Sequence, residues 1–91
     1  MEVRFSTDRE TDLPHIYDHG VAEEEAEEIL GRPGEIRRER RGTYSKLGQT
    51  ATGRFLRVIY TMDREAGIIY VITAYQPTAR MVKGYRRRRK R

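Results

Sequence analysis

Two long runs of strand-forming residues dominate the second half of the sequence and limit the folds that it can adopt. Residues 54–62 read Arg-Phe-Leu-Arg-Val-Ile-Tyr-Thr-Met, and residues 68–75 read Ile-Ile-Tyr-Val-Ile-Thr-Ala-Tyr. β-Branched and aromatic side chains of this kind favour strands. Residues 63–67 (Asp-Arg-Glu-Ala-Gly) separate the two runs and predict a turn. We therefore expect a pair of antiparallel strands, with the more apolar run 68–75 at the centre of the sheet.

Further strands are predicted on the N-terminal side of this pair. Residues 43–49 form a third candidate strand, and residues 50–53 (Thr-Ala-Thr-Gly) predict the hairpin that follows it. Residues 35–41 are almost all charged, which suits either an exposed edge strand or a loop. Val3 and Phe5 alternate with charged neighbours, so they predict a short first strand.

Helical periodicity is clearest in residues 21–31, where four apolar side chains recur at the spacing of one helix face: Ala22, Ala26, Ile29 and Leu30. Residues 12–19 predict a shorter helix, with Pro14 in its first turn and Gly20 as its C-terminal cap. Residues 79–87 predict a final helix, which begins soon after a proline that blocks further strand pairing.

The predicted elements define an α+β fold with a short N-terminal strand, two helices, an antiparallel meander of three to four strands and a C-terminal helix. Helices on one side of an antiparallel sheet are typical of this class. A chain of 91 residues has room for one domain. We expect residues 1–86 to form that domain and residues 87–91 to form a basic C-terminal tail.

The charge of the chain is concentrated at its C-terminal end. Residues 80–91 contain no acid and eight basic side chains: Arg80, Lys83, Arg86, Arg87, Arg88, Arg89, Lys90 and Arg91. Because the whole chain has a net charge of +5 and this segment contributes +8, the preceding 79 residues have a net charge of −3. Such a split predicts an interaction with a polyanion, RNA above all, or with another acidic surface.

The sequence contains no cysteine, so disulfides and thiolate metal sites are excluded, which fits a reducing compartment. No apolar run approaches the roughly 20 residues that a membrane-spanning helix needs. Residues 1–5 lack the apolar stretch of a signal peptide. We therefore expect a cytoplasmic protein without a membrane partner, and nothing in the sequence calls for a cofactor.

Two arginines of the run 54–62 are the leading candidates for a site. Arg57 lies among apolar residues, and a charge there is costly unless it is paired or its face is wet. Either Arg57 pairs with an acid such as Glu65, or it faces a groove that accepts an anion. Arg54 and Arg57 have opposite parity on a regular strand, so they share a face only at a bulge or at the sheet edge.

Other basic and aromatic side chains extend this candidate site. Phosphate contacts are predicted for five cations: Lys46, Arg80, Lys83, Arg86 and Arg87. Tyr75 suits either base stacking or core packing at the end of its strand. A cluster of this composition can also cleave RNA without a metal, because cations stabilise the charge that grows when the ribose 2′-OH attacks the adjacent phosphorus.

His15 and His19 lie four residues apart and can share one helix face. A metal site needs further ligands, and none is evident in the sequence, so we predict no metal. His19 suits either packing beside Gly20 or general acid–base chemistry.

Several segments together resemble the BrnT-type toxins, which belong to the RelE-like superfamily of bacterial toxin–antitoxin systems. The resemblance runs from about residue 3 to residue 86 and rests on five motifs: His19-Gly20-Val21 before a Glu-rich helix, Leu47-Gly48-Gln49-Thr50, Gly53-Arg54-Phe55-Leu56-Arg57-Val58-Ile59-Tyr60, Ile72-Thr73-Ala74-Tyr75 and Tyr85-Arg86. It implies a fold like that of microbial ribonucleases and metal-independent cleavage of messenger RNA. It also implies a cognate antitoxin that binds and neutralises the toxin, and it allows a homo-oligomer.

The same resemblance implies roles for individual residues. Arg54 matches the arginine that opens the central strand, Arg80 a basic residue after the last strand, and Tyr85 the tyrosine of the closing helix. Arg57 and His19 come from the residue arguments above, and with them we predict Arg54, Arg57, Tyr85 and His19 as catalytic residues. The chain departs from the family at Tyr75, where these toxins commonly have arginine, and at Ala22, where they often have the Ser or Thr of a helix cap.

Three functions follow from these observations. The first is a ribonuclease toxin of a type II system. The second is a non-catalytic nucleic-acid-binding module on the same fold, which the basic end and the departure at Tyr75 favour. The third is a subunit whose basic helix binds only an acidic protein partner.

Overall fold

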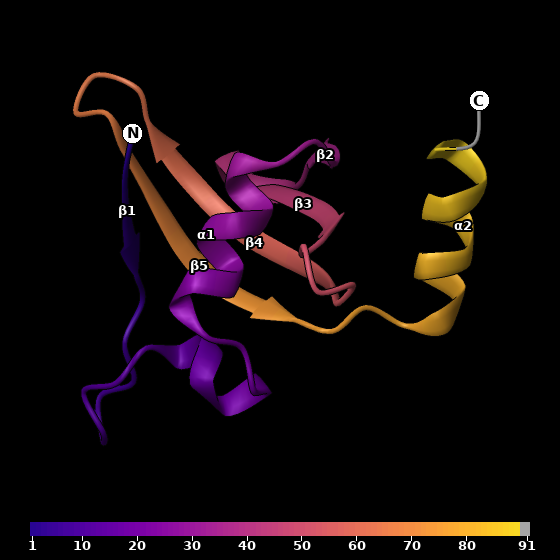
Figure 1. Ribbon diagram of the computed structural model, residues 1–91. Helices are drawn as coiled ribbons and strands as arrows, with labels where there is room; N and C mark the ends of the chain where they lie inside the picture. The colour runs from indigo at the N-terminus through magenta and orange to yellow at the C-terminus, as the bar shows by residue number, and fades with distance from the viewer. Residues whose placement is uncertain (90–91) are drawn as a thin grey trace.

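The computed structural model describes residues 1–89, and within them five strands form one sheet of order β1-β5-β4-β3-β2 (Figure 1). The strands are β1 (Glu2–Phe5), β2 (Glu35–Arg38), β3 (Tyr44–Gln49), β4 (Phe55–Asp63) and β5 (Ile68–Tyr75). Strands β2 to β5 form the predicted antiparallel meander. Strand β1 instead pairs with β5 in parallel, so the sheet is mixed. After β1 the chain passes through the helical segments and enters the sheet again at the far edge, β2.

The structure shows the position of the most apolar strand and the conformation of the charged segment 35–41. Strand β4 lies in the middle of the sheet, and β5 lies between β1 and β4, so the most apolar run is an interior strand but not the central one. The charged segment 35–41 is an edge strand over Glu35–Arg38 and then a 3-10 turn, η2 (Arg40–Gly42). Arg41 and Gly42 have positive φ angles of 55° and 73° in this turn, which connects β2 to β3.

Helix α1 (Glu23–Gly31) confirms the clearest helical prediction, and its apolar face packs onto the sheet. The helix expected over residues 12–19 is only a 3-10 helix, η1 (His15–His19), with Pro14 as its N-cap. It is shorter because residues 7–14 form a loop that a β-bridge between Thr7 and Pro14 closes. No helix in the described part of the chain is long and apolar enough to cross a membrane.

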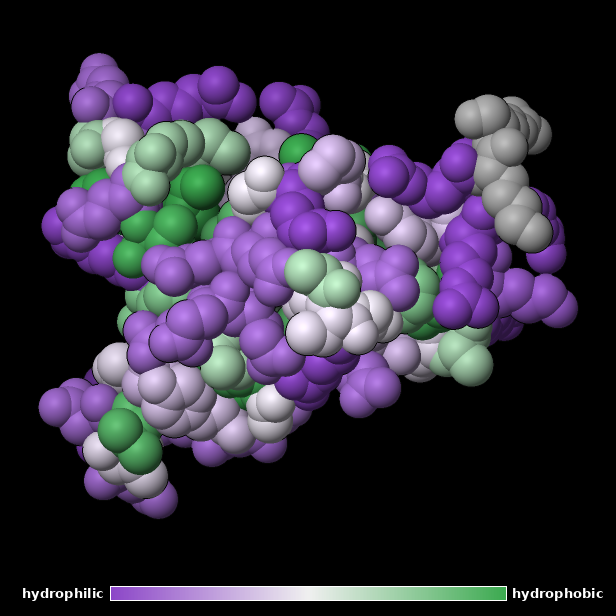
Figure 2. Space-filling view, viewed as in Figure 1, coloured by the Kyte–Doolittle hydropathy of each residue, from purple (hydrophilic) through white to green (hydrophobic). Residues whose placement is uncertain are grey.

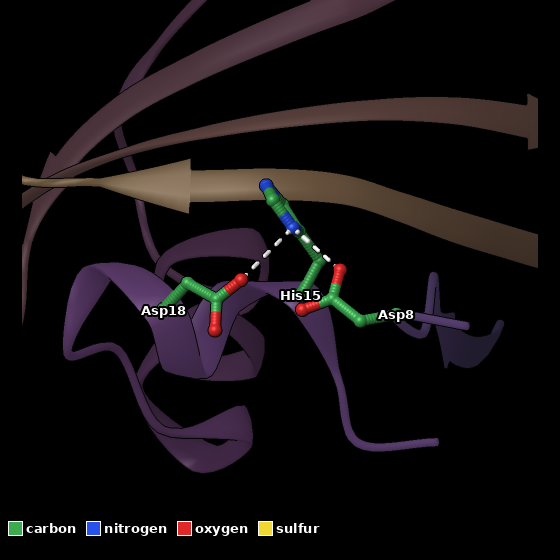
Figure 3. Close-up of side chains that lie close together, drawn as sticks. All are labelled: Asp8, His15 and Asp18. Atoms are coloured by element: carbon green, nitrogen blue, oxygen red, sulfur yellow. Dashed lines mark hydrogen bonds and ion pairs between the residues drawn. The ribbon is translucent and has the colours of Figure 1, made fainter. Parts of the chain in front are cut away.

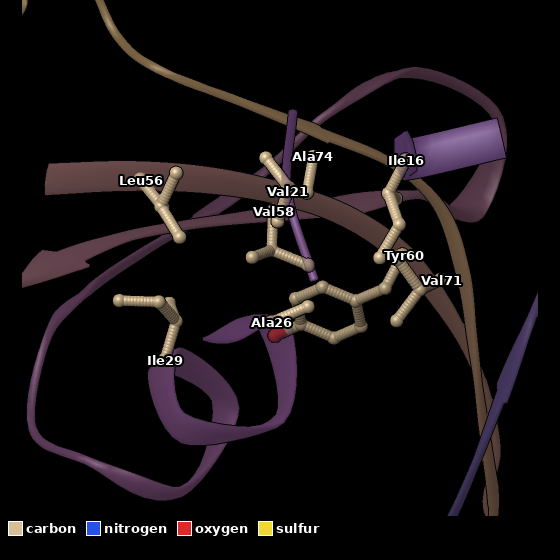
Figure 4. Close-up of a cluster of buried hydrophobic side chains, with 9 residues drawn as sticks. All are labelled: Ile16, Val21, Ala26, Ile29, Leu56, Val58, Tyr60, Val71 and Ala74. Atoms are coloured by element: carbon tan, nitrogen blue, oxygen red, sulfur yellow. The ribbon is translucent and has the colours of Figure 1, made fainter. Parts of the chain in front are cut away.

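The hydrophobic core lies between α1, η1 and one face of the sheet (Figure 4). Its buried members are Ile16, Val21, Ala26, Ile29, Leu56, Val58, Tyr60, Val71 and Ala74. Alternate residues of β4 point into this core, which fixes the direction of every other side chain on that strand. Phe55 and Arg57 consequently belong to the opposite face.

Helix α2 (Ala79–Arg89) lies on that opposite face. The prediction that the helices lie on one side of the sheet is therefore wrong. The Tyr85 ring of α2 meets Phe55 edge-on, and its Arg88 pairs with Glu35. The helix continues through Arg89, so residues 87–89 of the predicted tail are helical, while residues 90–91 lie outside the described chain. The surface over α2 is strongly hydrophilic (Figure 2).

Candidate nucleic-acid interface

Arg57 lies at the centre of the candidate interface, on the face of β4 that points away from α1. Its register partners are Leu47 on β3 and Tyr75 on β5. The guanidinium donates to the Tyr75 hydroxyl and pairs with Glu39, with an Nη2–Oε2 distance of 3.1 Å. Glu65, the acid considered from the sequence, lies in the turn after Asp63, at the other end of β4. The acid that pairs with Arg57 is therefore Glu39.

Glu39 is held in place by a second donor. The Ser45 hydroxyl donates to its Oε2 atom over 2.8 Å, and Ser45 itself is buried. The Ser45 hydrogen bond and the Arg57 charge together lower the pKa of Glu39. The carboxylate is thus fixed beside the arginine and held in its anionic form.

Tyr75 connects Arg57 to a histidine. The Arg57 Cζ atom lies 5.8 Å from the centroid of the Tyr75 ring, which is a cation–π arrangement. The exposed His19 ring meets Tyr75 edge-on at 6.2 Å between centroids. Tyr75 is half-buried and is not a member of the core cluster. The structure therefore brings together three groups from β4, β5 and η1: a guanidinium, a phenol and an imidazole.

Arg54 does not share an anion partner with Arg57. Its Nη1 atom pairs with Glu25 of α1 at 2.7 Å, on the side of the sheet that carries the core. Glu25 also accepts from the backbone N–H of Ala22, and both contacts lower the pKa of Glu25. No bulge interrupts the strand between the two arginines, because the irregularity in β4 comes later, at Ile59 and Tyr60. The expectation that both arginines hold one phosphate is therefore wrong in this geometry.

Lys46 and Tyr85 are also placed away from an open phosphate site. Lys46 points to the α1 side of the sheet, where it is only 7% exposed and its Nζ donates to the Leu30 carbonyl over 2.9 Å. Burial lowers the pKa of this ammonium. Tyr85 is buried between Phe55 and the rest of α2. Lys46 therefore contacts the end of α1, and Tyr85 packs against Phe55, so neither side chain is open to a phosphate.

The exposed cations of α2 line hollows beside this face of the sheet. Arg80, Lys83, Arg86 and Arg87 are exposed. Arg80 and Arg57 line a common hollow of about 200 Å³ between α2 and the sheet. A larger hollow of about 750 Å³ has Lys83, Arg86 and Arg87 in its wall. The structure thus joins Arg80 to Arg57 and gathers the remaining predicted phosphate contacts of α2 beside them.

One group of side chains in the described chain has the composition of a metal site. Asp8, His15 and Asp18 offer ligand atoms that all lie within 4.8 Å of one another (Figure 3). The His15 Nδ1 atom lies 2.9 Å from Asp8 and 3.5 Å from Asp18. A hydrogen bond to Asp8 raises the pKa of Asp18, because two facing carboxylates can share one proton. These contacts already satisfy the three groups, and His15 in turn meets His19 at 5.2 Å between ring centroids.

We compared the chain with protein-family models, curated proteins and solved structures. No family model, no curated protein and no solved structure matches it. The geometry described above is therefore what supports a function.

Two residues of this site were not among the predicted site residues. Glu39 lies in a segment of charged residues, and the sequence of that segment does not distinguish it from its neighbours. Tyr75 was recognised only as an ambiguous aromatic residue at a strand end. Strand pairing explains both. The β2–β3 and β3–β4 pairs bring Glu39, the residue after β2, beside Arg57, and the β4–β5 pair sets Tyr75 opposite Arg57.

Proposed function

We propose that the protein is an endoribonuclease that binds single-stranded RNA along α2 and cleaves it beside Arg57. The observation that carries this proposal is a chain of contacts in which Arg57 pairs with Glu39 and donates to Tyr75, and the Tyr75 ring meets His19 at the end of β5. A fixed cation, a carboxylate and an imidazole are the groups that RNA cleavage through the 2′-hydroxyl requires.

Each group has a separate step in this chemistry. The Glu39 carboxylate removes the proton from the ribose 2′-OH, and the oxygen forms a bond to the adjacent phosphorus. Arg57 and the Tyr75 hydroxyl stabilise the charge on the phosphorane oxygens. The His19 imidazole protonates the 5′-oxygen as the bond from phosphorus to that oxygen breaks. The products are a 2′,3′-cyclic phosphate and a 5′-hydroxyl end.

The cations of α2 supply the affinity for RNA. Arg80 faces the same hollow as Arg57, and Lys83, Arg86 and Arg87 continue the positive surface along the helix. Phosphate contacts of this kind position a strand without selecting its sequence. The strand would follow α2 and place one phosphate beside Arg57.

The resemblance to BrnT-type toxins extends this proposal to a biological role. A ribonuclease of this kind would arrest growth when it is induced alone, and a cognate antitoxin would neutralise it by covering the basic surface. Induction in a bacterial host without growth arrest would argue against the toxic role while leaving the cleavage reaction open to direct assay.

The decisive experiment compares RNA cleavage by wild type, Arg57→Ala and Arg64→Ala in the presence of EDTA. We expect Arg57→Ala to lower the cleavage rate by about 100-fold or more, because the transition state no longer meets a preorganised donor. Arg64 lies in the β4–β5 turn, and its replacement removes the same charge, so this control should cleave close to the wild-type rate. Circular dichroism spectra check that all three proteins are folded.

Equal rates for Arg57→Ala and wild type would remove Arg57 from the reaction. Absence of cleavage by the wild-type protein, with RNA binding retained, would instead favour a non-catalytic RNA-binding module. One observation supports that second function: the Arg57 guanidinium already contacts Glu39 and Tyr75, whereas Lys83 and Arg87 on α2 are exposed.

A further inference from the structure

A hollow on the Phe55 side of α2 plays no part in the proposed cleavage chemistry. It has a volume of about 450 Å³, and its wall includes Arg32, Gln49, Phe55, Tyr85, Arg86 and Arg89. Sites for small organic ligands have volumes of roughly 300–1,000 Å³. The size and composition therefore suit an organic group with an aromatic face.

The wall of this hollow presents stacking surfaces. The Arg86 guanidinium lies 5.1 Å from the centroid of the Phe55 ring, and Arg89 lies 5.7 Å from that of Tyr85. The two rings meet edge-on at 6.0 Å, which holds Phe55 in a fixed orientation. Nucleobases stack on aromatic rings and on the planes of arginine guanidinium groups. The hollow therefore offers a base a planar support of both kinds.

Gln49 adds a group that can read the edge of a base. Its Nε2 atom donates to the Gly53 carbonyl over 3.0 Å, and this contact orients the amide. One N–H donor and the Oε1 acceptor of the amide remain available. Glutamine pairs in this manner with the N6 and N7 atoms of adenine. The turn that supplies Gly53 depends on its positive φ angle of 97°, so the sequence Thr-Ala-Thr-Gly helps to hold the amide in place.

The charges around the hollow suit the backbone that accompanies a base. Arg86 and Arg89 are exposed on α2, and Arg32 is exposed just after α1. Within residues 1–89, Arg32 pairs with Glu28 at 3.6 Å, whereas Arg86 and Arg89 take part in no ion pair, so these two guanidinium groups can meet a phosphate. A negatively charged nucleotide therefore fits this hollow better than a neutral ring.

We infer that the hollow between Gln49, Phe55 and Arg86 binds one unpaired purine base of an RNA strand, with adenine preferred. This inference rests on the proposed function, in which RNA runs along α2. The base stacks on the Arg86–Phe55 pair, and Gln49 pairs with its N6 and N7 atoms. The site fixes where a strand lies relative to Arg57 and so adds a base preference to an interface that otherwise contacts phosphates.

The test measures dissociation constants for fluorescent six-nucleotide oligoadenylate and oligouridylate with wild type, Gln49→Leu and Gln76→Leu. Gln49→Leu keeps the size of the side chain but removes its hydrogen bonds. We expect wild type to prefer oligoadenylate by roughly tenfold or more, and Gln49→Leu to lose most of that preference. Gln76→Leu makes the same chemical change outside this hollow, in the wall of the hollow of about 750 Å³, so it can weaken the binding of both oligonucleotides equally while its preference between them should equal that of wild type.

The outcomes separate this inference from the function on which it rests. Tight binding of both oligonucleotides with no preference, or a preference that Gln49→Leu retains, would overturn the adenine site while RNA binding stands. If neither oligonucleotide binds, the proposed function fails, and titration with adenosine monophosphate decides the inference alone. Amide chemical-shift changes at Gln49 and Phe55 in that titration support the site, and their absence overturns it.

Discussion

At the scale of single residues, Gly20 determines how the chain turns from η1 into α1. Its φ angle of 70° lies in the left-handed region, which side chains with a Cβ atom adopt only at a cost. The Gly20 N–H donates to the Tyr17 carbonyl, and the next N–H, from Val21, donates to Ile16. This turn brings Ile16 and Val21 into the same core. It also confirms the predicted C-terminal cap at Gly20.

Gly20→Ala should lower the free energy of unfolding by about 1–2 kcal/mol, because alanine is strained at this φ angle. Gly31→Ala is the matched control: Gly31 ends α1, has no positive φ angle, and an added Cβ would meet nothing within 4 Å. That variant should be stabilised by about 0.5 kcal/mol. Urea denaturation measures both, and equal destabilisation of the two variants would contradict the role of the backbone angle.

Residues of one chemical type take different roles here because strand parity separates them. Arg54 and Arg57 are three positions apart, so one contacts α1 and the other the opposite face. The sequence raised this parity problem but could not supply the partner of either side chain. The partners, Glu25 and Glu39, lie 29 and 18 residues away along the chain.

At the scale of elements, α1 begins without the side-chain cap that Ser or Thr would provide at Ala22. Glu25 compensates, because its carboxylate accepts from the Ala22 N–H and simultaneously pairs with Arg54. Acids in the first turn also complement the helix dipole. One side chain thus anchors the start of α1 to the beginning of β4.

This arrangement predicts a dependence of stability on pH. The pKa of Glu25 is lowered in the folded state, first by the Ala22 N–H and then by Arg54, so its contribution to stability is present above the unfolded pKa of about 4.3. It is lost as the pH falls through the lowered folded pKa. Thermal denaturation between pH 5 and pH 2.5 should therefore show a smaller acid-induced loss of stability for Glu25→Gln than for wild type.

Glu27→Gln serves as the control for removing one negative charge from an exposed position of the same helix. Identical acid profiles for the two glutamine variants would show that the contacts of Glu25 do not contribute to stability.

At the scale of the whole molecule, the basic residues from Arg80 to Arg89 all lie on one helix. Helix α2 runs to Arg89, and its cations surround hollows on both of its sides. A helix fixes the spacing of these charges, which a flexible segment would not do. The surface that we propose to bind RNA therefore has a defined shape.

RNA binding should weaken steeply with salt, because the strand releases counterions when its phosphates bind cations. Replacing Lys83 and Arg87 with glutamine should reduce the slope of log affinity against log salt by about 0.7 for each phosphate that is no longer neutralised. The double variant of Arg9 and Arg64, which removes the same charge away from α2, should retain the wild-type slope. Fluorescence anisotropy at several salt concentrations measures the slopes, and equal slopes would exclude α2 from the RNA interface.

The sequence by itself determined most of the elements, because periodicity and turn residues are local signals. The strands β3, β4 and β5, the helix α1, the Gly20 cap and the basic character of α2 all follow from such patterns. The α+β class followed as well. The parallel pairing of β1, the placement of α2 on the other face and the shortened η1 did not, because each depends on contacts between distant segments.

The candidate site divides in the same way. Arg57, His19 and Arg80 were predicted by residue type and position, whereas Glu39 and Tyr75 acquired their places from strand register. Lys46 became a buried donor to Leu30 because its parity points it toward α1. Local sequence sets which side chains a strand offers, but only the pairing of strands and the packing of helices decides which of them meet. For this protein, that packing places Glu39 and Tyr75 on either side of Arg57 and sets the His19 ring against Tyr75.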